Sequence, residues 1–167
     1  MGNGMVRKVD ELGRVVIPKE MRRILNIKTG SSIEMFINDQ NQVVLKKFSE
    51  LENVNSFIET LVKTIYECFN FACFVCDDEK VLNVCGLSKK EFLAKKVNCN
   101  LAFKDEVQTN LGTILSECGS EQSCYIFSII CEGFESGKLV IVTSKIEEET
   151  KLSIVALLKF FCGLLSF

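Results

Sequence analysis

The 167-residue sequence contains no histidine, the side chain used most often for acid–base catalysis near neutral pH and for binding transition metals. It also contains no second CxxC motif beside Cys73-Phe-Val-Cys76, although a structural zinc site needs four protein ligands. The sequence also shows no cofactor-binding motif and no recognisable set of catalytic residues. We therefore expect no metal site, no bound cofactor and no enzymatic activity.

The sequence has little that would direct it to a membrane or out of the cell. No apolar run follows the first basic residues, so no secretory signal peptide is predicted. The most apolar stretch, LSIVALLKFFCGLLSF at residues 152–167, is interrupted by Lys159 and is shorter than the roughly 20 apolar residues that span a bilayer. We predict a buried helix there and no membrane partner.

Cysteine is abundant but confined to the second part of the chain. The nine cysteines are at positions 68, 73, 76, 85, 99, 118, 124, 131 and 162. An odd number without a secretory signal argues against a disulfide framework and for a reducing cytoplasm. Cys73 and Cys76 lie in the apolar run FACFVCD, which predicts a buried strand on which residues three apart point to opposite faces. The two thiols are therefore expected to be small buried apolar groups and not metal ligands.

Charge is distributed unequally along the chain. Residues 1–48 contain 9 Lys and Arg against 5 Asp and Glu, a net charge of +4, whereas residues 49–167 contain 11 against 17, a net charge of −6. Such asymmetry indicates a basic module with a polyanionic partner, joined to a module with another role. The alternative is that the basic side chains only solvate a surface.

The basic module alternates short β-type runs with one short helix. Strands are predicted over 5–9, 14–17, 32–38 and 42–48, and a helix over 18–25, with Gly13 in a turn that needs positive φ. On the helix, Met21, Ile24 and Leu25 are predicted to face inward, and Lys19, Arg22 and Arg23 to form a cationic stripe. Four short strands and a two-turn helix give a marginal core, which a dimer sharing strands would complete.

This segment closely resembles the AbrB-type transition-state regulators. The resemblance rests on VRKVDELGRVVIPKEMRRILNI at 6–27 and SSIEMFINDQNQVVLKKF at 31–48. It implies that two chains exchange β-hairpins to form one dimeric barrel that binds double-stranded DNA. Carried over to this sequence, it implies DNA contacts for Arg7, Lys8, Arg14, Arg22 and Arg23.

Residues 49–70 are predicted to form a connecting helix. Ser49 and Glu52 make a capping box, and apolar residues then repeat at alternating spacings of three and four. The repeating residues are Leu51, Val54, Ile58, Leu61, Ile65 and Cys68. Such a seam favours either a coiled coil between chains or packing on the helix's own domain. Both alternatives stay open from the sequence.

Residues 71–167 predict an α/β domain with an antiparallel sheet. Strands are expected over 71–77, 81–86, 124–131 and 138–144, with a turn region at Gly133 and Gly137. Ser88 is expected to cap a helix, and a second helix should run from about 147 to 165. That terminal helix is apolar almost all round, which argues for burial on several sides and for oligomerisation. The stretch VCGLSKKEFLAKKV at 84–97 resembles GAF domains of sporulation regulators.

Together these features predict an α+β chain: a swapped-hairpin barrel at 1–48, a connecting helix at 49–70 and a GAF-like domain at 71–167. We expect a cytoplasmic, nucleoid-associated transcription regulator that binds DNA as a dimer of dimers. The GAF-like domain would sense a small-molecule effector or serve only for oligomerisation.

Two other functions fit parts of the sequence. An antitoxin can use the same type of DNA-binding barrel, but its toxin-binding tail is usually short and poor in apolar residues. An enzyme with a cysteine nucleophile would need Lys, Arg or a helix N-terminus to activate the thiol, because histidine is absent.

Overall fold

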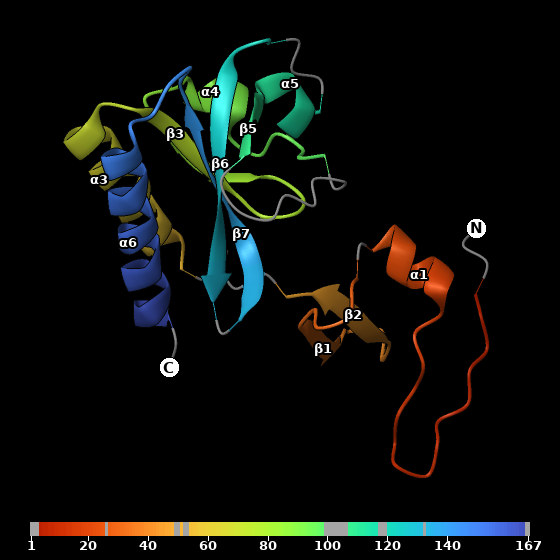
Figure 1. Cartoon of the computed structure of the whole chain (residues 1–167). Coiled ribbons are helices and arrows are strands. Elements are labelled where there is room, and N and C mark those ends of the chain that lie inside the picture. The colour runs from red at the N-terminus through yellow and green to blue at the C-terminus, as the bar shows by residue number, and fades with distance from the viewer. Residues whose placement is uncertain are drawn as a thin grey trace. The chain divides into compact units, whose positions relative to one another are not determined.

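The chain divides between Phe48 and Ser49 into an N-terminal unit, Met1–Phe48, and a second unit, Ser49–Phe167. The computed structural model describes residues 4–25, 27–48, 51, 54–98, 107–116, 120–131 and 133–165 (Figure 1). Both units mix helices with antiparallel sheets, as the sequence predicts.

The N-terminal unit contains helix α1 (Lys19–Ile24) and the hairpin of β1 (Ile33–Ile37) and β2 (Val43–Lys47). The two strands pair antiparallel, with Ile33 opposite Lys47 and Ile37 opposite Val43. Asn41 adopts the left-handed conformation in the connecting turn, and Asn38 Oδ1 accepts hydrogen bonds from the N–H groups of Gln40 and Gln42. Both strands predicted over 32–48 are therefore present.

The strands predicted at 5–9 and 14–17 are not formed in this single chain. Both segments are irregular arms joined by a turn at residues 10–13, and Val6, the most exposed of their apolar residues, is 92% exposed. A β-strand exists only when its N–H and C=O groups are paired with a neighbouring strand. Within the described part of this unit, the backbone hydrogen bonds of these arms are confined to the turn, from Asp10 N to Arg14 O and from Gly13 N to Asp10 O.

The prediction of an inward-facing apolar side for α1 is also wrong. Met21, Ile24 and Leu25 are exposed, and Ile24 is 79% exposed. Among the described residues of the N-terminal unit, Pro18 alone is buried. Fewer than 50 residues supply too little apolar surface to enclose a core around one short helix and one hairpin.

The second unit is built on a five-stranded antiparallel sheet with the order β4-β3-β7-β6-β5. Its strands are β3 (Ala72–Cys76), β4 (Val81–Cys85), β5 (Val107–Asn110), β6 (Ser123–Cys131) and β7 (Phe134–Val142). Its helices are α3 (Asn55–Phe69), α4 (Lys89–Phe92), α5 (Leu111–Ile114) and α6 (Glu148–Leu165). The helix predicted from Ser88 is the single turn α4, whose N-cap Ser88 makes no side-chain capping bond.

Helices cover both faces of this sheet (Figure 1). On one face, α3 and α6 pack on alternate residues of the central strands, including Val75, Phe127 and Leu139. On the other face, α5 and Phe92 pack on the intervening residues of the same strands, including Phe74 and Ile126. The period-2 alternation of the strands thus separates two apolar clusters.

Helix α3 packs on its own sheet. Leu51, Ile58, Leu61 and Ile65 are buried in the cluster beneath α3 and α6, whereas Cys68 is exposed. Of the two alternatives for the apolar seam, packing on the helix's own domain therefore accounts for most of its residues. The capping box of Ser49 and Glu52 lies outside the described residues.

Strand β7 begins at Phe134, earlier than the predicted start at residue 138. Gly133 lies in the turn with positive φ, but Gly137 is inside the strand, opposite Ile129. A Cβ atom at residue 137 would meet the side chain of Leu51 and approach the carbonyl oxygen of Cys76 to 2.6 Å. Gly137 therefore marks a close approach and not a turn.

Candidate nucleic-acid interface

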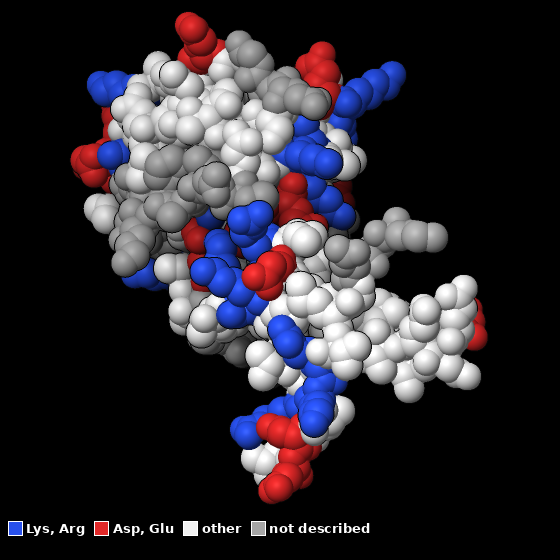
Figure 2. All heavy atoms as spheres, turned by 90° about the vertical axis from the view of Figure 1, so that its right-hand side faces the viewer, with Lys and Arg blue, Asp and Glu red and all other residues white. Residues whose placement is uncertain are grey.

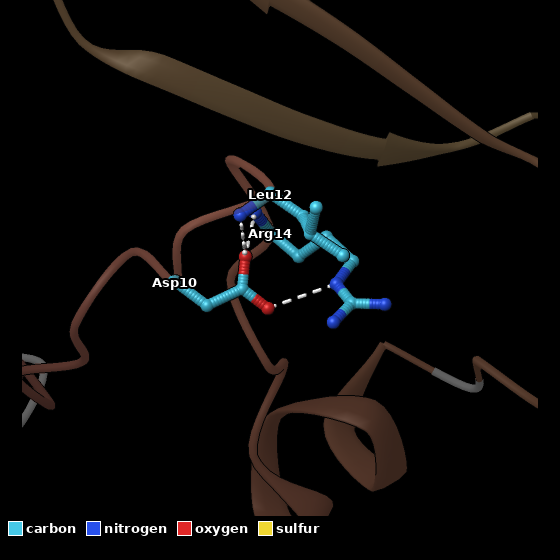
Figure 3. A network of polar contacts seen from close by, with 3 residues as sticks. All are labelled: Asp10, Leu12 and Arg14. Atoms are coloured by element: carbon cyan, nitrogen blue, oxygen red, sulfur yellow. Dashed lines mark hydrogen bonds and ion pairs between the residues drawn. The ribbon is translucent and has the colours of Figure 1, made fainter.

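The turn between the two N-terminal arms is organised by Asp10. Its Oδ1 accepts hydrogen bonds from the N–H groups of Leu12 at 3.0 Å and Arg14 at 2.8 Å (Figure 3). Its Oδ2 accepts a third from Arg14 Nε at 2.8 Å. Gly13 completes the turn at φ +76°, which an L side chain rarely adopts. One carboxylate therefore fixes both the backbone of the turn and the direction of the Arg14 side chain.

This arrangement holds the carboxylate in its charged form. The Arg14 N–H first, and then the Arg14 side chain, lower the pKa of Asp10 below its ordinary value of 3.8. The Arg14 side chain is itself 70% exposed. Since Asp10 uses only Nε, the terminal nitrogens of the guanidinium stay available to a phosphate.

The sequence pattern alone does not single out this role of Asp10. Asp at the first position of a turn with Gly at the fourth is typical of a type I turn, so the pattern predicts Asp10 only as a turn residue. The same Asp-x-x-Gly-Arg spacing is the signal from which an ion pair with the following arginine could have been predicted.

Helix α1 presents the second group of cations. All six of its residues are exposed, among them Lys19, Arg22 and Arg23, and Pro18 is its N-cap. Arg22 and Arg23 lie in the last turn, where the helix dipole favours positive charge. The helix thus displays three cations that are exposed to solvent.

The five predicted residues come from three segments of the N-terminal unit. Arg7 and Lys8 lie in the first arm, Arg14 follows the turn, and Arg22 and Arg23 belong to α1; all five are exposed. Within the described residues, Arg14 alone of the five forms an ion pair. Figure 2 shows basic side chains on the surface with acidic ones among them, so the face drawn is not uniformly positive.

Cys73 and Cys76 of the CxxC motif are buried apolar groups. Cys73 packs in one apolar cluster and Cys76 in the other, which confirms that the CxxC thiols lie on opposite faces of the sheet. Burial raises the pKa of each thiol to about 12, so neither is a thiolate at neutral pH. Across the described ranges, no three Cys, Asp or Glu side chains group to hold a metal ion. No helix in this part of the chain is long and apolar enough to cross a membrane.

Two protein-family models match consecutive parts of the chain. The model described as "Antidote-toxin recognition MazE, bacterial antitoxin" matches residues 6–49. The model described as "Stage V sporulation protein T C-terminal, transcription factor" matches residues 50–166.

Three curated proteins of Bacillus subtilis (strain 168) are similar in sequence. Stage V sporulation protein T is 38% identical over 95 residues, which cover 57% of this chain and 53% of that protein. The putative transition state regulator Abh is 56% identical over 45 residues, covering 27% of this chain and 48% of that protein. The transition state regulatory protein AbrB is 53% identical over 45 residues, covering 27% of this chain and 46% of that protein. The chain spans about half the length of the curated relatives it matches.

Proposed function

The chain belongs to the family of stage V sporulation protein T C-terminal transcription factors, whose model covers residues 50–166, and from this we propose that it is a DNA-binding transcription regulator. The observation that carries the proposal is the set of exposed cations in the N-terminal unit, in the segment that the antitoxin family model matches at residues 6–49. Arg7, Lys8, Arg14, Arg22 and Arg23 would hold phosphates of double-stranded DNA.

The expected mode of binding is electrostatic with broad specificity. Where a guanidinium enters a groove it can make bidentate contact with guanine. Few other side chains of the N-terminal unit are suited to read base edges, so DNA shape and bendability would dominate selection.

We propose that two N-terminal units exchange hairpins to form one barrel. The support is energetic: apolar side chains of this unit are widely exposed, among them Val16, Met35 and Ile37. Pairing the arms at 5–9 and 14–17 with a second chain would supply the missing strand partners and a core. The second units would then join two such dimers into a tetramer.

The second unit has a further role in the proposal, either sensing a small molecule or only assembling the oligomer. An antiparallel sheet covered by helices on both faces supports a GAF-like domain. Helix α3 follows the N-terminal unit in sequence and packs on this sheet. A ligand that moves α3 would therefore change the fraction of molecules that are in the DNA-binding conformation.

A salt titration tests the DNA-binding function directly. If four cations per chain each neutralise one phosphate, a dimer makes about eight contacts, and log K should fall against log salt with a slope of about −7. Fluorescence anisotropy of a labelled AT-rich duplex measures this slope. A slope near zero would contradict the proposal.

Toxin neutralisation is the second candidate, because the model matching residues 6–49 is that of a bacterial antitoxin. Against it, the remainder of the chain has a large buried core, whereas toxin-binding tails are usually disordered. Absence of DNA binding in the titration, together with a toxin gene adjacent to the coding region, would favour this alternative.

A further inference from the structure

A small cavity lies between α3 and β4 of the second unit. It is lined by Glu59, Val62 and Lys63 of α3, by Asn83, Val84 and Cys85 of β4, and by Gly86, Leu87 and Lys89. Its volume is about 170 Å³. An engineered cavity of about 150 Å³ holds a benzene molecule, whereas drug-sized ligands occupy about 300–1,000 Å³. The cavity therefore suits a ligand, or the part of a ligand that enters it, of about six to eight non-hydrogen atoms.

A buried amide faces this cavity without a full set of partners. Asn83 is 9% exposed, and its Oδ1 accepts a hydrogen bond from the N–H of Val84 at 2.8 Å. Its Nδ2 group has no hydrogen-bond partner among the described residues. Buried polar groups are nearly always satisfied, so this donor calls for an acceptor in the cavity.

The charged side chains of the lining favour an anion. Glu59 forms an ion pair with Lys63 at 3.0 Å, and Lys89 forms no ion pair with a described residue. Lys89 lines the same cavity as this pair, and Lys63 first, and Lys89 more weakly, lower the pKa of Glu59. With two lysines and one glutamate the lining carries a net charge of +1, which one negative charge would balance.

The rest of the lining on this face of the sheet is apolar. Val62 is buried in the cluster beneath α3 and α6 and Cys85 packs against that cluster, whereas the side chains of Val84 and Leu87 pack in the cluster on the other face. Apolar walls with a few convergent polar groups are typical of small-molecule sites. A ligand that fits this lining has an acidic end and a short branched or straight hydrocarbon chain.

We infer that the cavity between α3 and β4 binds a small aliphatic carboxylate, recognised by Lys89 and the Asn83 amide, with its chain against Val62 and Cys85. The carboxylate can belong to a simple fatty acid or to an aliphatic α-amino acid. The inference deepens the proposed sensing role and rests on it only for the regulatory consequence. Because Glu59 and Lys63 belong to α3, an occupied cavity would act on the helix that follows the DNA-binding unit.

Calorimetric titration of the full chain with 3-methylbutanoate, without DNA, tests the site. Wild-type protein should bind with saturation at millimolar ligand. Lys89→Met should weaken binding by about tenfold or more, because it removes a charge-assisted contact. Lys90→Met is the matched control: Lys90 is exposed, loses the same charge and does not line the cavity. It should bind as wild type does.

Two further ligands, an α-amino acid and an alcohol, show which chemical groups the site recognises. Binding of L-leucine as well as the acid would assign the site to carboxylates with or without an α-amine, whereas binding of the acid alone would restrict it to simple carboxylates. Binding of 3-methylbutan-1-ol as tightly as the acid would overturn the inference. So would no saturation with either carboxylate, or equal weakening by Lys89→Met and Lys90→Met.

The same preparations should be tested in the DNA anisotropy assay. Duplex binding without carboxylate binding would remove this inference and leave the proposed function. Carboxylate binding without duplex binding would support this inference and contradict the proposed DNA-binding function.

Discussion

Asp10 and Arg14 form an ion pair at 2.8 Å across a turn whose backbone the same carboxylate also fixes. An acidic residue beside a proposed phosphate-binding arginine reduces the local positive charge, yet here it limits the orientations of the side chain. The entropy of ordering Arg14 is then lost on folding and not on binding DNA.

Asp10 should titrate below its ordinary pKa of 3.8 in the folded chain. Because its folded pKa is lowered, its stabilising effect on the turn is present above pH 3.8 and is lost as the pH falls through the folded value. Arg14→Ala should raise the pKa of Asp10 without restoring it fully, because the backbone N–H of residue 14, the larger cause, remains. Carboxyl-carbon NMR titration of both proteins measures this. An identical pKa in the variant would show that the guanidinium does not contribute.

Replacement of the proposed DNA-contacting arginines should reduce the salt dependence of DNA binding. Each lost phosphate contact makes the negative slope less steep by about 0.9. Arg14→Ala or Arg22→Ala, which removes two contacts in a dimer, should therefore reduce the magnitude of the slope by about 2. Lys145→Ala, at an exposed residue of the second unit, removes the same charge and should leave the slope unchanged. Equal effects of all three variants would indicate that net charge alone governs binding.

The exposed and buried cysteines should differ strongly in reactivity. Cys68 is exposed, whereas burial raises the pKa of Cys73 and Cys76 to about 12 and that of Cys124 to about 11. Iodoacetamide at mildly alkaline pH should therefore modify Cys68 first and these three only after unfolding, because the thiolate is the reactive form. Timed alkylation with peptide mass spectrometry, with and without guanidinium, gives the order. Rapid modification of a buried thiol in the folded chain would favour the cysteine-enzyme alternative.

The second unit can be predicted from sequence better than the first, for a physical reason. Strand β6 and helix α6 are long and pack on their own chain, so their periodicity of apolar residues largely reflects burial. In the N-terminal unit the same patterning of Met21, Ile24 and Leu25 predicts burial that one chain does not provide. Apolar periodicity indicates that a face needs covering and does not identify the chain that covers it.

The elements of the second unit that the sequence does not predict have a different cause. β5 and α5 are four residues each, too short for a periodic signal. Gly137 is predicted in a turn because glycine is typical of turns, whereas its position depends on Leu51, far away in the sequence. The cavity beside Asn83 likewise brings together α3 and β4, which no local motif connects.

The packing at Gly137 predicts opposite effects at two glycines. Gly137→Ala places a methyl group against Leu51 and the Cys76 carbonyl, and overpacking of this kind typically costs about 1–3 kcal/mol in the free energy of unfolding. A methyl group at residue 163, within α6, would meet nothing within 4 Å beyond the helix's own backbone. Gly163→Ala should therefore stabilise by about 0.5–1 kcal/mol through helix propensity. Urea unfolding followed by circular dichroism compares them, and equal midpoints would contradict the packing.

The proposed tetramer predicts that the outer face of α6 is an interface. Leu152 and Phe160 are 68% and 67% exposed, and their spacing places them on one side of the helix together with Leu164. Phe160→Glu introduces a charge where a second copy would pack, so it should convert tetramers into dimers while the N-terminal units still bind DNA. Lys159→Gln is the matched control, since it changes the charge by the same amount at the adjacent exposed residue. Light scattering after size exclusion gives the mass of each, and a tetramer that survives Phe160→Glu would place the interface elsewhere.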